Sequence, residues 1–183
     1  MVLNNKPQMF SVYFPTNFFY SNVVEKWETI VKRMKLPYES VCDFMNNQIQ
    51  SVTFPALNLD NATQQRWNYE VAYAQGKELE PVITKTLTMT FKLTESYASY
   101  FIMWDQLDTY LHYHSRKELP EVNPWLEPIS LSFLTDSGHK LTSFIFREIT
   151  PKSLSDLNLS YAAQIASYNN FNFTMMYNRF DIE

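Results

Sequence analysis

Apolar and polar residues alternate through the last third of the chain, residues 129–183, and this pattern restricts the folds that the chain can adopt. Ile129, Leu131 and Phe133 alternate with serines, and Asp136-Ser137-Gly138 then supplies residues that tolerate a tight turn. A return strand is predicted over 141–149. Because successive side chains of a strand point to opposite faces, the pattern indicates a β-hairpin with one buried face.

Two more segments with this alternation complete the chain. After Pro151, which cannot donate a backbone hydrogen bond to a sheet, Leu157, Leu159 and Tyr161 recur with a period of two. A polar turn at 168–170 precedes the last strand. The apolar face of that strand comprises Phe171, Phe173, Met175 and Tyr177. A terminus this apolar is predicted to be paired in a sheet or at an interface.

Four earlier segments also alternate as strands do. They are residues 8–14, 49–55, 66–74 and 85–93. In the third of them Trp67, Tyr69, Val71 and Tyr73 are expected on one face. Apolar residues spaced three and four apart predict helices over 22–34, 41–49 and 97–111.

The composition favours self-association and disfavours a general affinity for nucleic acid. Aromatic residues make up 16% of the 183 residues, and such side chains dominate protein interfaces as well as cores. The net charge of −4 provides no electrostatic attraction for phosphates. The sequence has no run of eighteen apolar residues and no charged-then-apolar leader, so we expect a soluble chain, made in the cytoplasm, without a membrane anchor.

No catalytic or metal-binding motif is present, so an enzyme is not expected and no cofactor is predicted. Two glycines in the whole chain exclude the usual phosphate-binding loops. His112 and His114 are two residues apart on a predicted helix, a spacing that does not suit chelation, and His139 lies far away in sequence. Asp105 and Asp108 are interpreted as exposed helix acids. The single cysteine, Cys42, is interpreted as a small core residue.

The order of these elements resembles the tail-tube proteins of contractile-tailed, T4-like bacteriophages, most strongly over residues 84–183. That family has a D-x-x-G-type turn, a strand ending at a proline, an L-x-L-x-aromatic segment and a final strand F-x-F-x-x-x-Y-x-x-F with an acidic end. The corresponding residues are Asp136, Gly138, Pro151, Leu157, Leu159, Tyr161, Phe171, Phe173, Tyr177, Phe180 and Glu183.

The resemblance implies a mainly β, α+β fold, an antiparallel β-sandwich or partial barrel of the tail-tube type. Residues 1–183 would form one domain. Residues 95–115 would be a helix packing across the sandwich, and residues 58–84 an arm-like loop or hairpin that reaches the next ring. Residues 18–48 would be a helical insertion that the family pattern lacks.

The resemblance further implies a structural virion protein of the phage tail. Its copies would form stacked hexameric rings inside a contractile sheath, and the lumen would conduct DNA during ejection. The expected partners are other copies of the chain, the tail sheath, baseplate or neck proteins and, transiently, DNA and the tape-measure protein in the lumen.

Two groups of residues are candidates for these contacts. If subunits close into a ring, the polar strand faces would line the lumen; a solvated outer sheet face would have the same pattern. These candidates are Thr86, Thr88, Thr90, Lys92, Asn172 and Thr174. Aromatic anchors between subunits or in the core are expected at Trp67, Tyr69, Phe171, Phe173 and Tyr177.

Two alternatives remain open on the sequence alone. The insertion at 18–48 also suits a ring at the end of a tube, either a baseplate tube initiator or a neck or tail terminator. A monomeric β-sandwich could instead bind a sugar or a peptide through Trp104 or Trp125.

Overall fold

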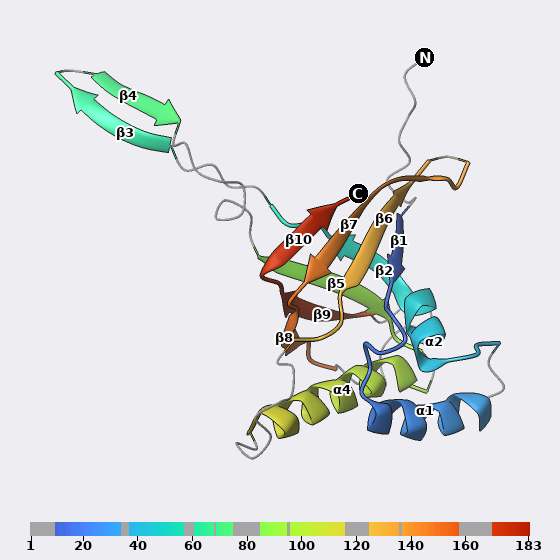
Figure 1. Cartoon of the computed structure of the whole chain (residues 1–183). Helices are drawn as coiled ribbons and strands as arrows, with labels where there is room; N and C mark the ends of the chain where they lie inside the picture. The colour runs from blue at the N-terminus through green and yellow to red at the C-terminus, as the bar shows by residue number, and fades with distance from the viewer. Residues whose placement is uncertain are drawn as a thin grey trace, which may run out of the picture.

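A computed structural model describes residues 10–33, 37–56, 61–67, 69–74, 85–94, 96–115, 125–135, 137–157 and 170–183. Over these ranges the chain forms two four-stranded antiparallel sheets, three helices and a separate two-stranded hairpin (Figure 1). The antiparallel β fold with packed helices that the sequence predicted is therefore confirmed.

The first sheet has the strand order β1-β6-β7-β10. Its strands are β1 (Phe10–Tyr13), β6 (Ile129–Leu134), β7 (Lys140–Arg147) and β10 (Arg179–Ile182). The predicted β6–β7 hairpin is confirmed, and its turn places Gly138 at a φ of 81°, which glycine tolerates. The Gly138 N–H donates to the Thr135 carbonyl at 2.8 Å and closes the turn.

The second sheet has the strand order β2-β5-β9-β8. Its strands are β2 (Ile49–Thr53), β5 (Thr86–Lys92), β9 (Asn170–Met176) and β8 (Thr150–Leu154). Alternate residues of β5 and β9 are fully buried, as the period of two predicts. Phe91 is registered opposite Phe171, and Met89 opposite Phe173, so the two central strands supply the middle of the core.

The chain changes sheet at two neighbouring points. Between β7 and β8 it turns at Glu148, whose φ of 54° is unusual for a residue other than glycine. Between β9 and β10 it turns at Asn178, whose N–H donates to the Arg147 carbonyl at 3.3 Å. The predicted return strand over 141–149 is confirmed as β7, which ends at Arg147. The prediction of a single closing strand was wrong, because that strand divides at Asn178 into β9 and β10.

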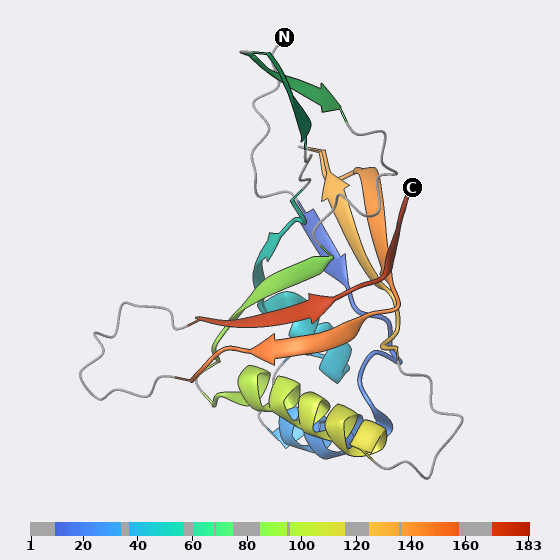
Figure 2. The same cartoon turned by 90° about the vertical axis from the view of Figure 1, so that its left-hand side faces the viewer.

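Three helices cover one side of the sheets: α1 (Ser21–Arg33), α2 (Val41–Gln48) and α4 (Ala98–Ser115) (Figures 1 and 2). Their positions confirm the three predicted helical segments. Ser40 caps α2, because its side chain accepts a hydrogen bond from the Asp43 N–H at 3.1 Å. Of the helices that the structure describes, none combines the length and apolarity needed to cross a membrane.

Asp105 of α4 connects two helices instead of facing solvent. Its Oδ2 accepts hydrogen bonds from Lys26 Nζ at 2.5 Å and from the indole Nε1 of Trp27 at 2.6 Å, both on α1. Gln106, fully buried, makes a parallel connection by accepting from the Tyr20 N–H at 3.1 Å and donating to the Phe18 carbonyl at 2.9 Å. The interpretation of Asp105 as an exposed helix acid was wrong, whereas Asp108 is exposed.

The segment 66–74 is not one strand but part of a hairpin that stands apart from both sheets (Figures 1 and 2). Strand β3 (Asn61–Arg66) pairs with β4 (Tyr69–Ala74), and Trp67 lies in the turn at a φ of 58°. Trp67 was predicted to lie on a strand face with Tyr69. The prediction failed because apolar and polar residues keep alternating through the turn between β3 and β4, and no glycine marks that turn in the sequence.

Candidate assembly surfaces

A row of polar side chains lies on the face of β5 and β9 that points away from the core. The six candidates Thr86, Thr88, Thr90, Lys92, Asn172 and Thr174 lie on this face, since the residues that alternate with them are buried. The hydroxyls of Thr88 and Thr174 are 3.2 Å apart, and Thr90 Oγ1 donates to Asn172 Oδ1 at 3.0 Å. Only one of the six carries a charge, so the face is wettable and nearly neutral.

Three of the five aromatic candidates lie in the core of the single chain. Phe171, Phe173 and Tyr177 are 2% exposed or less. Phe171 stacks on Phe91 at a centroid distance of 5.3 Å, and Tyr177 meets Phe146 edge to face at 4.9 Å. These contacts join the two sheets and α4, because Phe171 also touches Tyr100.

Trp67 has the opposite environment. Its side chain is 98% exposed at the tip of the β3–β4 hairpin. Tyr69 begins β4, but its side chain lies outside the described residues. An indole exposed to this extent contributes nothing to the core, whereas buried tryptophans are among the strongest contributors to protein interfaces.

Tyr177 makes the stability of the fold sensitive to alkaline pH. Burial raises its pKa from 10.0 to about 12. Between these values the unfolded chain releases the phenolic proton and the folded chain keeps it, so stability is lost as the pH rises. From pH 9 to pH 12 the wild type should lose roughly 2 to 3 kcal/mol more than Tyr177→Phe, measured by urea unfolding. Equal losses in both proteins would contradict this assignment.

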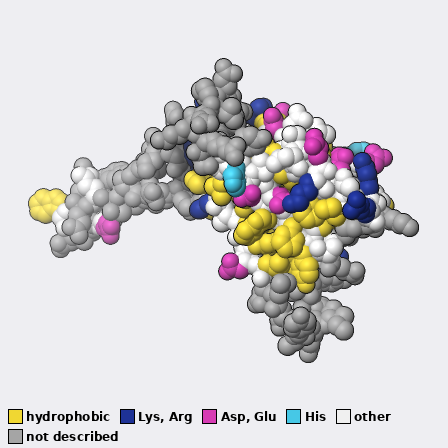
Figure 3. Space-filling model, turned by 90° about the horizontal axis from the view of Figure 1, so that it is seen from below, with side chains coloured by type: hydrophobic (Ala, Val, Ile, Leu, Met, Phe, Trp, Pro, Cys, Tyr) yellow, Lys and Arg dark blue, Asp and Glu magenta, His cyan; other side chains and the backbone are white. Residues whose placement is uncertain are grey.

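The outer face of α4 exposes large apolar side chains. Tyr100, Ile102 and Met103 point inward, whereas Phe101 and Trp104 are about half exposed and Leu111 is 63% exposed. Hydrophobic side chains gather on this side of the molecule (Figure 3). Trp104 and Leu111 are among the apolar residues whose spacing predicted the helix over 97–111, but both lie on its exposed side. Apolar residues occur on both sides of α4, so their spacing could not identify the buried face.

Two histidines and the cysteine have described side chains, and each lies in a different part of the fold. His112 Nδ1 lies 3.3 Å from the exposed carboxylate of Asp108, and His139 lies near the β6–β7 turn. The side chain of His114 is outside the described residues. Within the described ranges, no three His, Cys, Asp or Glu side chains are grouped so as to hold a metal ion. Cys42 is buried, as interpreted from the sequence, and desolvation raises the pKa of its thiol.

Two solved structures share this fold over almost the whole chain. One is a chain of the anti-feeding prophage baseplate, with 10% sequence identity and a TM-score of 0.53, covering 96% of this chain and 93% of that one. The other belongs to the tube-terminating cap of the same particle, with 12% identity and a TM-score of 0.50, covering 96% and 88%. The chain therefore shares the fold of these two chains, which is tail-tube-like.

A chain of the sheath-tube complex of an extracellular contractile injection system, PVC, has 13% identity and a TM-score of 0.46, covering 96% of this chain and 88% of that one. No family model matches the sequence, and no curated protein matches it. The tail-tube-like fold that the sequence pattern implied is confirmed at the level of fold.

Proposed function

We propose that this chain is a structural, non-catalytic subunit of a tail-tube-type assembly and that it forms rings with copies of itself. The observation that carries the proposal is the fold shared with a baseplate component and a tube-terminating cap over 96% of the chain. The indole of Trp67, 98% exposed, supports it, and so does the β3–β4 hairpin, which pairs with neither four-stranded sheet in the described part of the chain.

In the finer form of the proposal, six copies form a ring and rings stack into the tube of a contractile phage tail. The baseplate that contains the similar chain has been described with six-fold symmetry. The polar face of β5 and β9 would line the lumen. Hydroxyl and amide groups with a single cation would keep the lumen wet and bind passing DNA only weakly, since retention of DNA depends on clustered Lys and Arg. A sheath would surround the tube, baseplate or neck proteins would adjoin it, and the tape-measure protein would occupy the lumen before DNA.

A second candidate is a ring at one end of the tube. Two observations favour it. The two structures described above with TM-scores of 0.53 and 0.50 belong to a baseplate and a cap, and the helices α1 and α2 lie within the segment 18–48 that the tube-family pattern lacks. A repeating subunit must present complementary surfaces above and below itself, whereas an end ring needs only one.

Electron microscopy of the purified protein across concentration and salt series, with mass photometry alongside, tests the proposal. We expect rings with the mass of six chains. Tubes of unlimited length would identify a repeating tube subunit, and single rings that do not stack would identify an end ring. Monomers at every concentration would contradict self-assembly and leave either an end ring that needs a template or the monomeric binding module. For the binding module, ligand-dependent stabilisation is the corresponding test.

A further inference from the structure

The exposed side of α4 carries four side chains with the spacing of a helix-to-helix contact. Phe101, Trp104, Asp108 and Leu111 are all exposed, and the steps between them are three, four and three residues. In a heptad these are consecutive a and d positions, which form the seam between two packed helices. The opposite side of α4 is buried in the core, so these four residues point away from the body of the chain. We call them the α4 stripe.

The apolar part of the α4 stripe is large enough for a weak association. Phe101 and Trp104 are about half exposed and Leu111 is more so, which leaves roughly 300 Å² of their surface in water. A contiguous apolar patch of this size often marks a binding surface (Figure 3). Two such patches together bury less than the ~1,000 Å² of a stable interface, so the contact that they form is weak and depends on concentration.

The spacing of the α4 stripe is unchanged when the helix is read in the reverse direction. When two copies of α4 pack antiparallel, each a position faces a d position of the other helix. Phe101 then faces Leu111 of the second copy, and Trp104 faces its Asp108. Because the pair has two-fold symmetry, each contact is made twice. The stripe is therefore complementary to itself.

Asp108 determines the direction of this pairing. In a parallel pair the two Asp108 carboxylates would face each other, and like charges placed together oppose association. In the antiparallel pair each carboxylate faces the indole of Trp104, whose N–H is a hydrogen-bond donor. The chain already contains a contact of this kind between two helices, since Trp27 Nε1 of α1 donates to Asp105 Oδ2 of α4 at 2.6 Å.

We propose that two copies of this chain associate through the α4 stripe, with their α4 helices antiparallel. The second copy is the occupant because the stripe supplies both halves of each contact. This inference goes beyond the proposed ring. A two-fold contact closes at two copies, so it is not the contact that is repeated around a ring, and it forms between free subunits as well as between subunits of different rings.

Disulfide cross-linking tests the contact and its direction. Phe101→Cys and Leu111→Cys chains are mixed at roughly 100 μM, a concentration suited to a weak interface, and oxidised. The native Cys42 is buried and gives little background. In the antiparallel pair position 101 faces position 111, whereas the two copies of either position are about 15 Å apart along the helix axis, too far for a disulfide. We expect at least ten-fold more covalent dimer from the mixture than from either variant alone.

The matched control replaces Leu111→Cys by Leu141→Cys, because Leu141 of β7 is also exposed and lies outside α4. Equal amounts of dimer in the two mixtures would indicate random collision and would overturn the inference. More dimer from Phe101→Cys alone than from the mixture would indicate parallel pairing and would overturn it as well. So would the absence of dimer from chains whose circular dichroism matches that of the wild type.

An exchange of charge gives an independent, non-covalent measurement. Phe101→Lys and Leu111→Glu each remove an apolar contact, so each should lower the fraction of dimer in sedimentation velocity at least five-fold. Mixed together, the two variants form one Lys–Glu pair and keep one native Phe–Leu contact, so at least half of the wild-type dimer should return. A mixture that dimerises no better than either variant would contradict antiparallel pairing.

The two proposals fail separately. A wild type that forms the two-fold dimer and never forms rings would overturn the proposed function and leave this inference in place. Rings without a 101–111 cross-link would overturn the inference alone.

Discussion

Phe173→Ala is expected to lower the free energy of unfolding by about 3 to 5 kcal/mol. Phe173 is 0% exposed and lies at the centre of β9, registered opposite Met89 of β5 on one side and Leu154 of β8 on the other. Removing the aromatic ring leaves a cavity, because the residues of β5, β8 and β9 around it are held in place by their strands and cannot move in to fill it. Since domains of this size are stable by about 5 to 15 kcal/mol, the change removes a large part of the stability. Urea unfolding followed by circular dichroism measures it.

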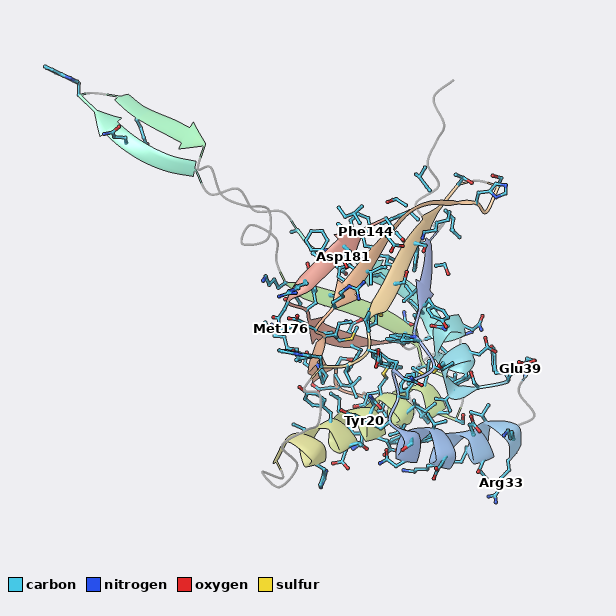
Figure 4. The ribbon with its side chains drawn as sticks, in the orientation of Figure 1. Tyr20, Arg33, Glu39, Phe144, Met176 and Asp181 are labelled. Carbon is cyan, nitrogen blue, oxygen red and sulfur yellow. The ribbon has the colours of Figure 1, made fainter. Side chains whose placement is uncertain are left out.

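Met176→Ala, three residues along the same strand, is the matched control. Its side chain is 44% exposed, and Figure 4 shows it near the end of β9 at the side of the sheet. The loss should be about 1 kcal/mol or less, because little of the side chain is removed from water in the folded state. A loss at Met176 as large as that at Phe173 would mean that the two faces of β9 are reversed, since a slip of one residue exchanges the faces of a strand.

The strand faces could be predicted from the sequence because strand geometry fixes a period of two. In β5 and β9 every apolar residue in the alternation is buried, and the polar row opposite is assembled from residues 86–92 and 172–174 as expected. The N-terminal strand behaves in the same way, with Val12 and Phe14 buried. Period alone therefore determined which residues of β5 and β9 face the core and which form the candidate lumen face.

Corners and turns could not be predicted, because an alternating pattern continues through them. At Glu148 and Asn178 the chain passes to the other sheet without a glycine, and the hydrogen bond from Asn178 to Arg147 that joins the two corners spans residues far apart in sequence. Trp67 illustrates the same limit. In the sequence it continues the alternation of Tyr69, Val71 and Tyr73, yet in the structure it lies in a turn.

Contacts between distant segments were also inaccessible to sequence reasoning. Asp105 reaches Lys26 and Trp27 across 79 and 78 positions, so only the packing of α1 on α4 distinguishes it from an exposed acid. The positions of β1, β10, β2 and β8 at the edges of the two sheets become visible only when the strand order is known. The residue types were present in the sequence, but their position at an edge depends on topology.

Trp67→Ala is expected to raise the protein concentration needed for half-assembly by roughly 30-fold or more and to change the free energy of unfolding by less than about 0.5 kcal/mol. The two effects separate because the indole is 98% exposed in the single chain, so its removal takes no contact from the core. The backbone at Trp67 has a φ of 58°, and alanine carries the same Cβ, so the strain of the turn is unchanged. A buried tryptophan anchor is typically worth 2 kcal/mol or more at an interface, and 1.4 kcal/mol corresponds to a factor of ten.

Mass photometry across a dilution series measures the assembly midpoint, and urea unfolding of the dilute monomer measures stability. Trp104→Ala is the control, since that indole is 54% exposed on α4, away from the hairpin. If the hairpin tip lies in the interface between subunits, Trp67→Ala shifts the assembly midpoint and Trp104→Ala does not. The shift is large because every subunit contact in the ring loses one indole. An unchanged midpoint for Trp67→Ala in a protein that still forms rings would exclude the hairpin tip from the interface and assign ring closure to the body of the sandwich.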